Sequence, residues 1–167
     1  MAAKIFIAHG QDHRARNETM ELIKALGLEP VVFSKTQDFG AWTIIEKLEH
    51  ITRDVEFAIV ILTPDDVSPT GLPSQEKYRA RQNVVFEMGW SFAKWGRGRT
   101  LLLLGGKRSD KLELPTNIDG VLYNRFRRTP KELTDKIRKT LIAGGVAIPK
   151  KRPRRARAAP KPPARTK

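Results

Sequence analysis

The sequence of 167 residues predicts an α/β fold, in which a parallel sheet of five strands is covered by helices on both faces. Short apolar runs rich in β-branched residues alternate along the chain with segments whose apolar residues recur at helical spacing. The third apolar run is hydrophobic at nearly every position, as in a strand buried on both sides. The length suits one domain, so these elements form a single sheet.

The apolar runs define the strands. They lie at residues 4–10, 30–34, 56–64, 99–106 and 121–126. Strands that follow one another in parallel need a crossover between them, and the intervening helices supply it. We expect the flavodoxin-like strand order 2-1-3-4-5, in which the order reverses between the first and third strands.

Four segments with helical periodicity separate or follow these strands. They span residues 14–27, 42–53, 81–95 and 130–143. The first ends at Gly27, a residue typical of helix ends. On the third helix, one face is apolar and should pack on the sheet, while a second face is mainly polar. The apolar face holds Val84, Val85, Met88, Phe92 and Trp95, and the second holds Asn83, Glu87, Trp90, Ser91 and Lys94.

The expected strand order points to a candidate site at the carboxyl edge of the sheet. Ligands of such sheets bind beyond the carboxyl ends of the strands, where the strand order reverses. His9 and Gly10 follow the first strand there, and Asp65 and Asp66 follow the third. The helix that comes next carries Glu87, so this residue belongs to the same region.

Glu87 is the one acidic residue in the run 79–89. An ionised carboxylate that leaves water without a partner costs several kcal/mol, so a buried Glu87 would need a functional reason. The spacing also allows a solvated glutamate near a helix N-terminus, where the helix dipole favours negative charge. Both interpretations stay open on residue pattern alone.

The net charge of +14 is concentrated at the end of the chain. Nine of the 32 Lys and Arg residues lie in 150–167 without any acid, which leaves the body with 23 basic and 18 acidic residues, or +5. We expect a domain at 1–148 and a disordered, basic, proline-rich tail at 149–167. Residues 150–167 fit attraction to nucleic acid by counterion release and a solubilising extension equally well.

Several classes of protein lack their signatures here. The chain has no cysteine, which excludes disulfides and thiolate metal sites. His9 and His13 alone are too few ligands for zinc, so we expect no metal. There is no G-x-G-x-x-G after the first strand and no G-x-S-x-G elbow. Because no apolar run is long enough for a signal peptide or a membrane span, we expect a cytoplasmic protein without membrane contact.

Five motifs in order resemble the bacterial TIR-like predicted nucleotide-binding family, whose domain occurs in cyclic-nucleotide-activated anti-phage effectors. They are IFIAHG (5–10), TIIEKLE (43–49), FAIVILTPDD (57–66), RARQNVVFEMGW (79–90) and ELPTNIDGVLY (113–123). The resemblance spans residue 4 to about residue 142. It implies a flavodoxin-like TIR fold and cleavage of NAD+ to nicotinamide and ADP-ribose or cyclic ADP-ribose. It further implies activation by self-assembly into a homo-oligomer, with NAD+ as substrate rather than cofactor.

The family's catalytic glutamate corresponds to Glu87. Cleavage of the bond between nicotinamide and ribose passes through an oxocarbenium-like state, which one carboxylate can stabilise. Trp42 stands where a smaller or polar residue is expected, which suggests stacking on a base. The resemblance implies that the substrate is bound by His9, Gly10, Lys35, Phe39, Trp42, Thr43, Asp65, Asp66, Arg81 and Asn83.

Other functions remain compatible with the same residues. One is a non-catalytic TIR-like module that senses a nucleotide or acts as a scaffold. Another is a protein localised on nucleic acid by the tail, which could coexist with catalysis. Transfer of the ribosyl group to another base would use the same carboxylate as hydrolysis.

Overall fold

The computed structural model describes residues 1–33, 40–68 and 77–149 of the chain. Its central sheet has the order β2-β1-β3-β6-β8, and every neighbouring pair is parallel. The strands are β1 (Lys4–His9), β2 (Glu29–Val32), β3 (Val55–Leu62), β6 (Thr100–Leu104) and β8 (Tyr123–Arg125). This order is the one that the sequence predicts, so the flavodoxin-like arrangement is confirmed.

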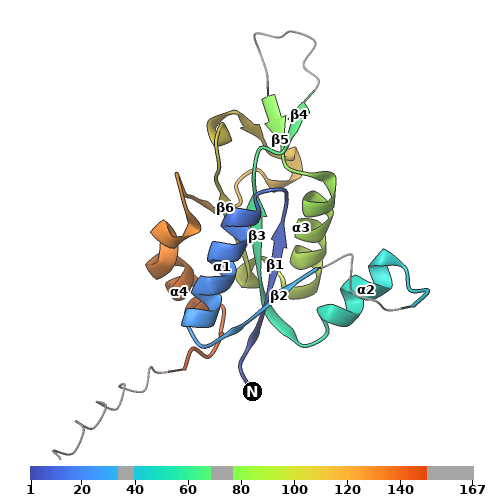
Figure 1. Cartoon of the computed structure of the whole chain (residues 1–167), viewed down its shortest axis with the longest axis vertical. Helices are drawn as coiled ribbons and strands as arrows, with labels where there is room; N and C mark the ends of the chain where they lie inside the picture. The colour runs from blue at the N-terminus through green and yellow to red at the C-terminus, as the bar shows by residue number, and fades with distance from the viewer. Residues whose placement is uncertain (34–39, 69–76, 150–167) are drawn as a thin grey trace, which may run out of the picture.

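Helices cover both faces of this sheet (Figure 1). On one side lie α1 (His13–Ala25) and α4 (Thr134–Ala143), and on the other lie α2 (Ile44–Ile51) and α3 (Gln82–Trp95). The last predicted helix begins with a separate 3-10 turn, η5 (Pro130–Leu133), because Pro130 stands in its first turn and Thr129 caps it. Among the described residues, further 3-10 turns are η2 (Arg97–Arg99), η3 (Ser109–Lys111) and η4 (Thr116–Ile118).

The core forms two layers because side chains alternate across the strands. Phe57, Ile59 and Ile61 of β3 face the layer that α1 and α4 complete with Ile23, Leu22, Ile137 and Leu141. Ala58, Val60 and Leu62 face the layer that α2 and α3 complete with Leu48, Val84 and Met88. These six β3 side chains are fully buried, as the continuous apolar run predicts. The sheet is therefore a rigid base for the loops at its carboxyl edge.

A second, three-stranded sheet at this edge is absent from the sequence-based prediction. Asp66–Ser68 forms β4, Lys77–Arg79 forms β5, and Leu112–Glu113 forms β7, in the order β4-β5-β7. Figure 1 draws β4 and β5 above the main sheet. Glu113 Oε2 accepts hydrogen bonds from Arg79 Nε (2.9 Å) and Ser68 Oγ (3.0 Å), which joins the three strands. Strands β4 and β5 border residues 69–76, which lie outside the described residues.

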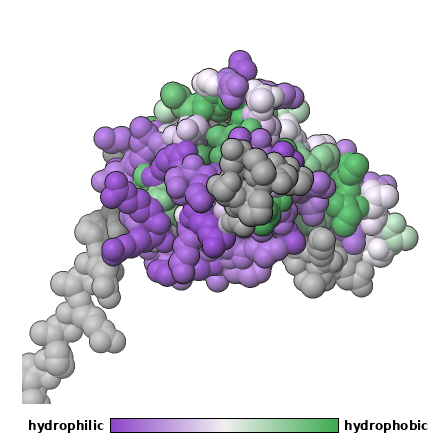
Figure 2. All heavy atoms as spheres, turned by 90° about the horizontal axis from the view of Figure 1, so that it is seen from above, coloured by the Kyte–Doolittle hydropathy of each residue, from purple (hydrophilic) through white to green (hydrophobic). Residues whose placement is uncertain are grey.

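The view onto the carboxyl edge is mostly hydrophilic, with a hydrophobic patch on the side of α2 (Figure 2). Ile44 and Ile45 of α2 are both about half exposed. In the part of the chain that is described, no helix is long and apolar enough to span a membrane. The predicted tail, residues 149–167, lies outside the described residues except for Pro149, and the division at residue 148 stays a prediction.

Candidate active site

Helix α3 positions Glu87 beside the sheet rather than on it. The helix starts after Arg81 and packs Val84 and Met88 into the core. Glu87 lies on the flank of this buried face and is half-buried. Ser91, predicted to share the polar face, is instead fully buried, and its hydroxyl donates to the Glu87 carbonyl oxygen at 2.7 Å. That bond lets the small Ser91 side chain enter the core, which corrects the prediction.

A cavity of about 290 Å³ contains the Glu87 side chain in its wall. It lies between the end of β2, helix α2 and the first half of α3. Its other walls are aromatic or aliphatic apart from one amide, and Phe86 at its edge is 48% exposed. The lining residues are Phe33, Ile44, Leu48, Asn83, Phe86 and Glu87. Of the predicted site residues, the structure brings Asn83 and Glu87 together here.

The environment of Glu87 disfavours its charged form. Burial raises the pKa of the Glu87 carboxyl from its usual value near 4.5 to about 7. Among the described residues, no hydrogen bond or ion pair to this carboxylate offsets the burial. A carboxylate held in this way binds and stabilises a cationic group more strongly than one in water, because the apolar walls weaken screening.

Asp65 has the opposite surroundings. Its Oδ1 accepts from the Thr63 hydroxyl at 2.9 Å, and its Oδ2 accepts from the Gln11 backbone N–H at 3.0 Å. A Cβ on Gly10 would lie 1.7 Å from Asp65 Oδ2, so only glycine leaves room for this carboxylate. Asp65 therefore fastens the loop after β1 to the end of β3, with both oxygens engaged.

The contacts of Asp65 with Thr63 and Gln11 form the Asp65 clamp. Arg81 and Asp66 lie next to this clamp and not in the Glu87 cavity. Arg81 Nε is 3.9 Å from Asp66 Oδ1, and both side chains are about half exposed. With its amide oxygen turned toward the guanidinium, Gln11 accepts from Arg81 Nη2 at 2.7 Å. These contacts join the loop after β1 to the start of α3. Exposed pairs of this kind contribute at most about 1 kcal/mol to stability.

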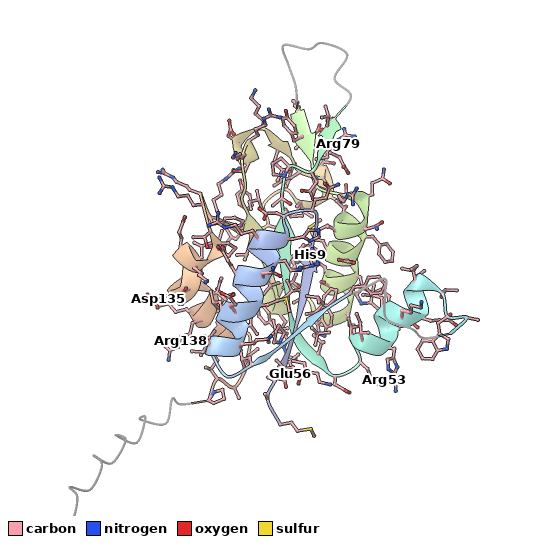
Figure 3. The ribbon with its side chains drawn as sticks, viewed as in Figure 1. His9, Arg53, Glu56, Arg79, Asp135 and Arg138 are labelled. Atoms are coloured by element: carbon pink, nitrogen blue, oxygen red, sulfur yellow. The ribbon has the colours of Figure 1, made fainter. Side chains whose placement is uncertain are left out.

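His9 is held at the carboxyl end of β1 (Figure 3). Its Nδ1 donates to the Gly10 carbonyl oxygen at 2.8 Å, and burial lowers the pKa of the His9 imidazole. Its ring packs edge-on against His13, with 6.0 Å between centroids. Within residues 1–33, 40–68 and 77–149, no group of three or more His, Asp or Glu side chains is arranged to hold a metal ion.

Comparison with protein families identifies the domain. Residues 4–128 match the family model described as "CAP12/Pycsar effector protein, TIR domain". The chain belongs to this TIR-domain family. The match covers all five strands of the main sheet and the helix that carries Glu87, so the resemblance inferred from the five motifs is confirmed.

Three relatives of this TIR domain show how much of each protein it represents. The uncharacterized protein YuaY of Escherichia coli (strain K12) is 42% identical over 126 residues, which are 75% of this chain and 40% of YuaY. Protein tirC of Dictyostelium discoideum is 33% identical over 141 residues, 80% of this chain and 69% of tirC. The Pycsar effector protein PaPycTIR of Pseudomonas aeruginosa is 35% identical over 88 residues, 53% of this chain and 27% of PaPycTIR. The chain thus spans less than half the length of the two bacterial relatives.

Trp42 and Thr43, which the resemblance places together at the substrate, have different surroundings in the structure. Thr43 caps α2 of the TIR domain, because its backbone N–H donates to Glu46 Oε2 at 2.7 Å and its hydroxyl accepts from Glu46 N–H at 3.2 Å. Trp42 contacts the His50 ring and lines a different cavity from that of Glu87. The predicted contributions of Lys35 and Phe39 lie outside the described residues.

Sequence reasoning missed most of the wall around Glu87. Ile44 and Leu48 belong to an apolar helical pattern, which indicates burial but not which cavity a side chain borders. Phe33 ends the second apolar run, so its pattern predicts a strand residue and not a cavity wall. Phe86 carried a usable signal, since it lies off the apolar face of α3 and directly precedes Glu87. An aromatic residue at such a position is a candidate for contact with a ligand.

Proposed function

We propose that this TIR domain is an NAD+ glycohydrolase, with Glu87 as the catalytic residue. The observation that carries the proposal is the Glu87 carboxylate in the wall of a small, mostly apolar cavity, without a described partner. Membership of the TIR-domain family supports the same assignment. Neither feature requires a metal ion or a resident cofactor, and NAD+ is the substrate.

The chemistry needs a single carboxylate. The bond between nicotinamide N1 and ribose C1′ breaks, and its electron pair moves to the pyridinium nitrogen, so nicotinamide leaves neutral. The ribose develops oxocarbenium character, and the ionised Glu87 carboxylate stabilises that positive charge. Water then adds to C1′ and loses a proton, which gives ADP-ribose. Attack by an adenine nitrogen instead of water would give the cyclic product.

The walls of the cavity suit the nicotinamide ring. Phe33 and Phe86 offer aromatic surfaces to a planar cation, and the Asn83 amide, one helical turn before Glu87, can hydrogen-bond a carboxamide or a ribose hydroxyl. A cavity of about 290 Å³ is at the small end of ligand pockets. It therefore encloses the nicotinamide-ribose end of the dinucleotide and leaves the adenylate end outside.

Release of nicotinamide tests the proposal directly. The purified chain is incubated with NAD+ across a range of protein concentrations, with and without a crowding agent, and nicotinamide is followed by chromatography. We expect release by the wild type and a loss of at least 10³-fold in Glu87→Gln. Glu56→Gln is the matched control, because Glu56 is an exposed acid at the opposite end of β3 (Figure 3). Equal release by wild type and Glu87→Gln, or none from the wild type in any condition, refutes the proposal.

We further propose that the domain acts as an anti-phage effector switched on by self-assembly. The support is the family and the relative named a Pycsar effector protein. If assembly activates the domain, specific activity rises with protein concentration in step with the average mass measured by light scattering. A specific activity that stays constant while the mass increases argues against this control.

A further inference from the structure

Two segments at the carboxyl edge of the sheet concentrate positive charge. They are residues 105–111, which follow β6, and residues 123–128, which contain β8 and the three residues after it. Together they hold six of the 23 basic residues of the body and one of its 18 acids, so their excess of five positive charges equals the net charge of the whole body. The six side chains, which we call the basic cluster, are Lys107, Arg108, Lys111, Arg125, Arg127 and Arg128.

Contacts hold the two segments side by side. Leu104 at the end of β6 pairs with Arg125 of β8, and Arg125 Nη1 donates to the Ser109 carbonyl oxygen at 3.0 Å. A Cβ on Gly105 would lie 2.1 Å from the Phe126 ring, so only a glycine lets the segments approach this closely. The fold therefore brings together cations from two separate parts of the chain.

Two of the arginines are held in place by aromatic side chains. The Arg125 Cζ lies 5.3 Å from the centroid of the Tyr123 ring. Arg108 donates from Nη1 to the Tyr78 hydroxyl, and its Cζ lies 5.1 Å from the centroid of that ring. The backbone of Arg108 has a φ of 66°, which is uncommon for a residue with a side chain. Guanidinium groups that are already positioned lose less side-chain entropy when they bind an anion.

The acids next to the basic cluster leave its charge unpaired. Among the described residues, none of the six side chains forms an ion pair. Asp12 caps α1, and Glu113 accepts hydrogen bonds within the small sheet. Glu132 accepts from the backbone N–H groups of residues 127–129. Asp110, inside the first segment, is exposed, so the six cations are available to an anion from outside the domain.

We propose that the basic cluster binds the phosphate backbone of nucleic acid. Four of its six groups are guanidiniums, whose planar fork matches the oxygens of a phosphate. Duplex DNA carries one negative charge for about each 1.7 Å of its axis, so several cations of the cluster can contact phosphates at once. This site is part of the folded domain, whereas the sequence indicates such an attraction only for residues 150–167.

The start of the basic tail favours an extended polyanion over a small anion. Residues 150–167 add nine basic residues and no acid. They begin directly after Pro149, which lines one cavity with Lys131 and Thr134. Lys131 is three residues from Arg128 of the cluster. A nucleic acid on the cluster can therefore attract the tail as well, which a single phosphate cannot do.

The basic cluster is remote from the Glu87 cavity. Strands β6 and β8 are at one end of the strand order, and β2 is at the other. Phe33, in the wall of the Glu87 cavity, follows β2, and none of the six cluster residues lines that cavity. Binding of nucleic acid at the cluster therefore does not depend on turnover of NAD+.

The salt dependence of DNA binding tests the proposal. Fluorescence anisotropy of a labelled duplex of about 20 base pairs is measured with the full chain over a series of salt concentrations. Lys107→Ala combined with Arg127→Ala removes one exposed cation from each segment. We expect this pair to weaken binding about 10-fold or more and to reduce the slope of log K against log salt by about 2, since each phosphate contact contributes about 0.9. No binding by the wild type, or the same affinity and slope in the variant, overturns the proposal.

Lys24→Ala combined with Arg53→Ala is the matched control. It removes the same charge at the opposite edge of the sheet, because Lys24 lies in the last turn of α1 and Arg53 follows α2 (Figure 3). Both side chains are exposed. We expect the affinity and the slope of the wild type. Equal weakening by the two pairs would show that net charge alone drives binding, which refutes a site at the cluster.

Anionic membranes are the competing partner. Leu122, which is 92% exposed directly before β8, would suit insertion into a lipid surface. Sedimentation with vesicles that contain phosphatidylserine measures this binding. Retention by vesicles that depends on Lys107 and Arg127, without binding of DNA, overturns the proposal.

Nicotinamide release and thermal unfolding separate this proposal from the glycohydrolase. Both double variants replace exposed side chains outside the Glu87 cavity, so they should unfold and release nicotinamide as the wild type does. Glu87→Gln should bind DNA with the affinity of the wild type. A loss of DNA binding in folded Glu87→Gln would place the nucleic acid at the Glu87 cavity and refute the cluster as its site.

Discussion

Two carboxylates near the carboxyl edge, those of Asp65 and Glu87, have contrasting surroundings. Asp65 uses both oxygens to fasten Gln11 and Thr63, and it fills the space above Gly10. Glu87 is half-buried against apolar side chains, with no hydrogen-bond or ion-pair partner for its carboxylate among the described residues, and burial raises its pKa to about 7. The hydrogen-bonded carboxylate of Asp65 holds two loops together. The carboxylate of Glu87 has surroundings that favour binding of a positively charged ligand.

Other acids in the TIR domain follow the pattern of Asp65. Glu132 accepts from the N–H groups of residues 127–129, and these bonds lower the pKa of its carboxyl. Hydrogen bonds from Arg79 and Ser68 lower that of Glu113. Of the carboxyls with a resolved shift, Glu87 has the raised pKa. Perturbation in this direction is typical of acids that act on ligands.

The largest expected effect separates the two carboxylates by activity. Glu87→Ala should abolish nicotinamide release, a loss of at least 10³-fold, because the charge that stabilises the ribosyl cation is gone. Asp65→Ala should lose about 1–2 kcal/mol of stability, since two hydrogen bonds disappear, but keep activity within about 10-fold. Chromatographic assay and denaturant unfolding of the same preparations measure both quantities. A 10³-fold loss in folded Asp65→Ala would instead place Asp65 on the substrate, as the resemblance implies.

The next effect tests the close packing of Gly10 against the Asp65 carboxylate. Gly10→Ala should destabilise the fold by about 1–3 kcal/mol, because the new Cβ displaces Asp65 Oδ2 from its partners. In an Asp65→Ala background this steric conflict is absent, so the same substitution should cost much less. A double-mutant cycle by denaturant unfolding measures the difference. Strictly additive effects would show that Gly10 and Asp65 do not interact energetically.

A third prediction concerns the free energy of unfolding that is lost when the Glu87 carboxyl ionises. Its pKa is raised on folding, so the folded state binds more protons between about pH 4.5 and 7, and stability falls as pH rises through this range. Glu87→Gln removes this loss and should be more stable than wild type by about 1–3 kcal/mol at pH 8. The two proteins should converge near pH 4. An equal difference at both pH values would contradict a raised pKa.

The sequence predicts the fold well because its elements depend on local patterns. The run from Phe57 to Leu62 is apolar throughout, and such a run is typical of a strand covered on both faces. The second sheet was missed because β4, β5 and β7 have two or three residues each, too few to show a periodicity. Their pairing depends on the contacts of Glu113 with Arg79 and Ser68, which are distant in sequence.

The site was predicted only in part for a similar reason. Motifs pointed to Glu87, but its burial depends on Phe33 and Leu48, which belong to other elements. The expected strand order placed Asp65 at the correct edge of the sheet. It did not predict the hydrogen bonds that the Asp65 carboxylate accepts from Gln11 and Thr63. Trp42 shows the limit most clearly, since it lines a different cavity from that of Glu87. The assignments of substrate contacts other than Glu87 stay predictions.

The smallest and most specific effect is the pH dependence of catalysis. If the ionised form of Glu87 stabilises the ribosyl cation, kcat/KM should rise about 10-fold per pH unit below 7 and level off above it, because kcat/KM reports the free enzyme. The profile of kcat should turn at lower pH, since the bound pyridinium cation favours the carboxylate and lowers its pKa. Both profiles come from initial rates of nicotinamide release between pH 5 and 9. If kcat/KM instead levels off near pH 4.5, Glu87 is solvated in the active assembly. Its environment would then resemble that of an ordinary surface acid.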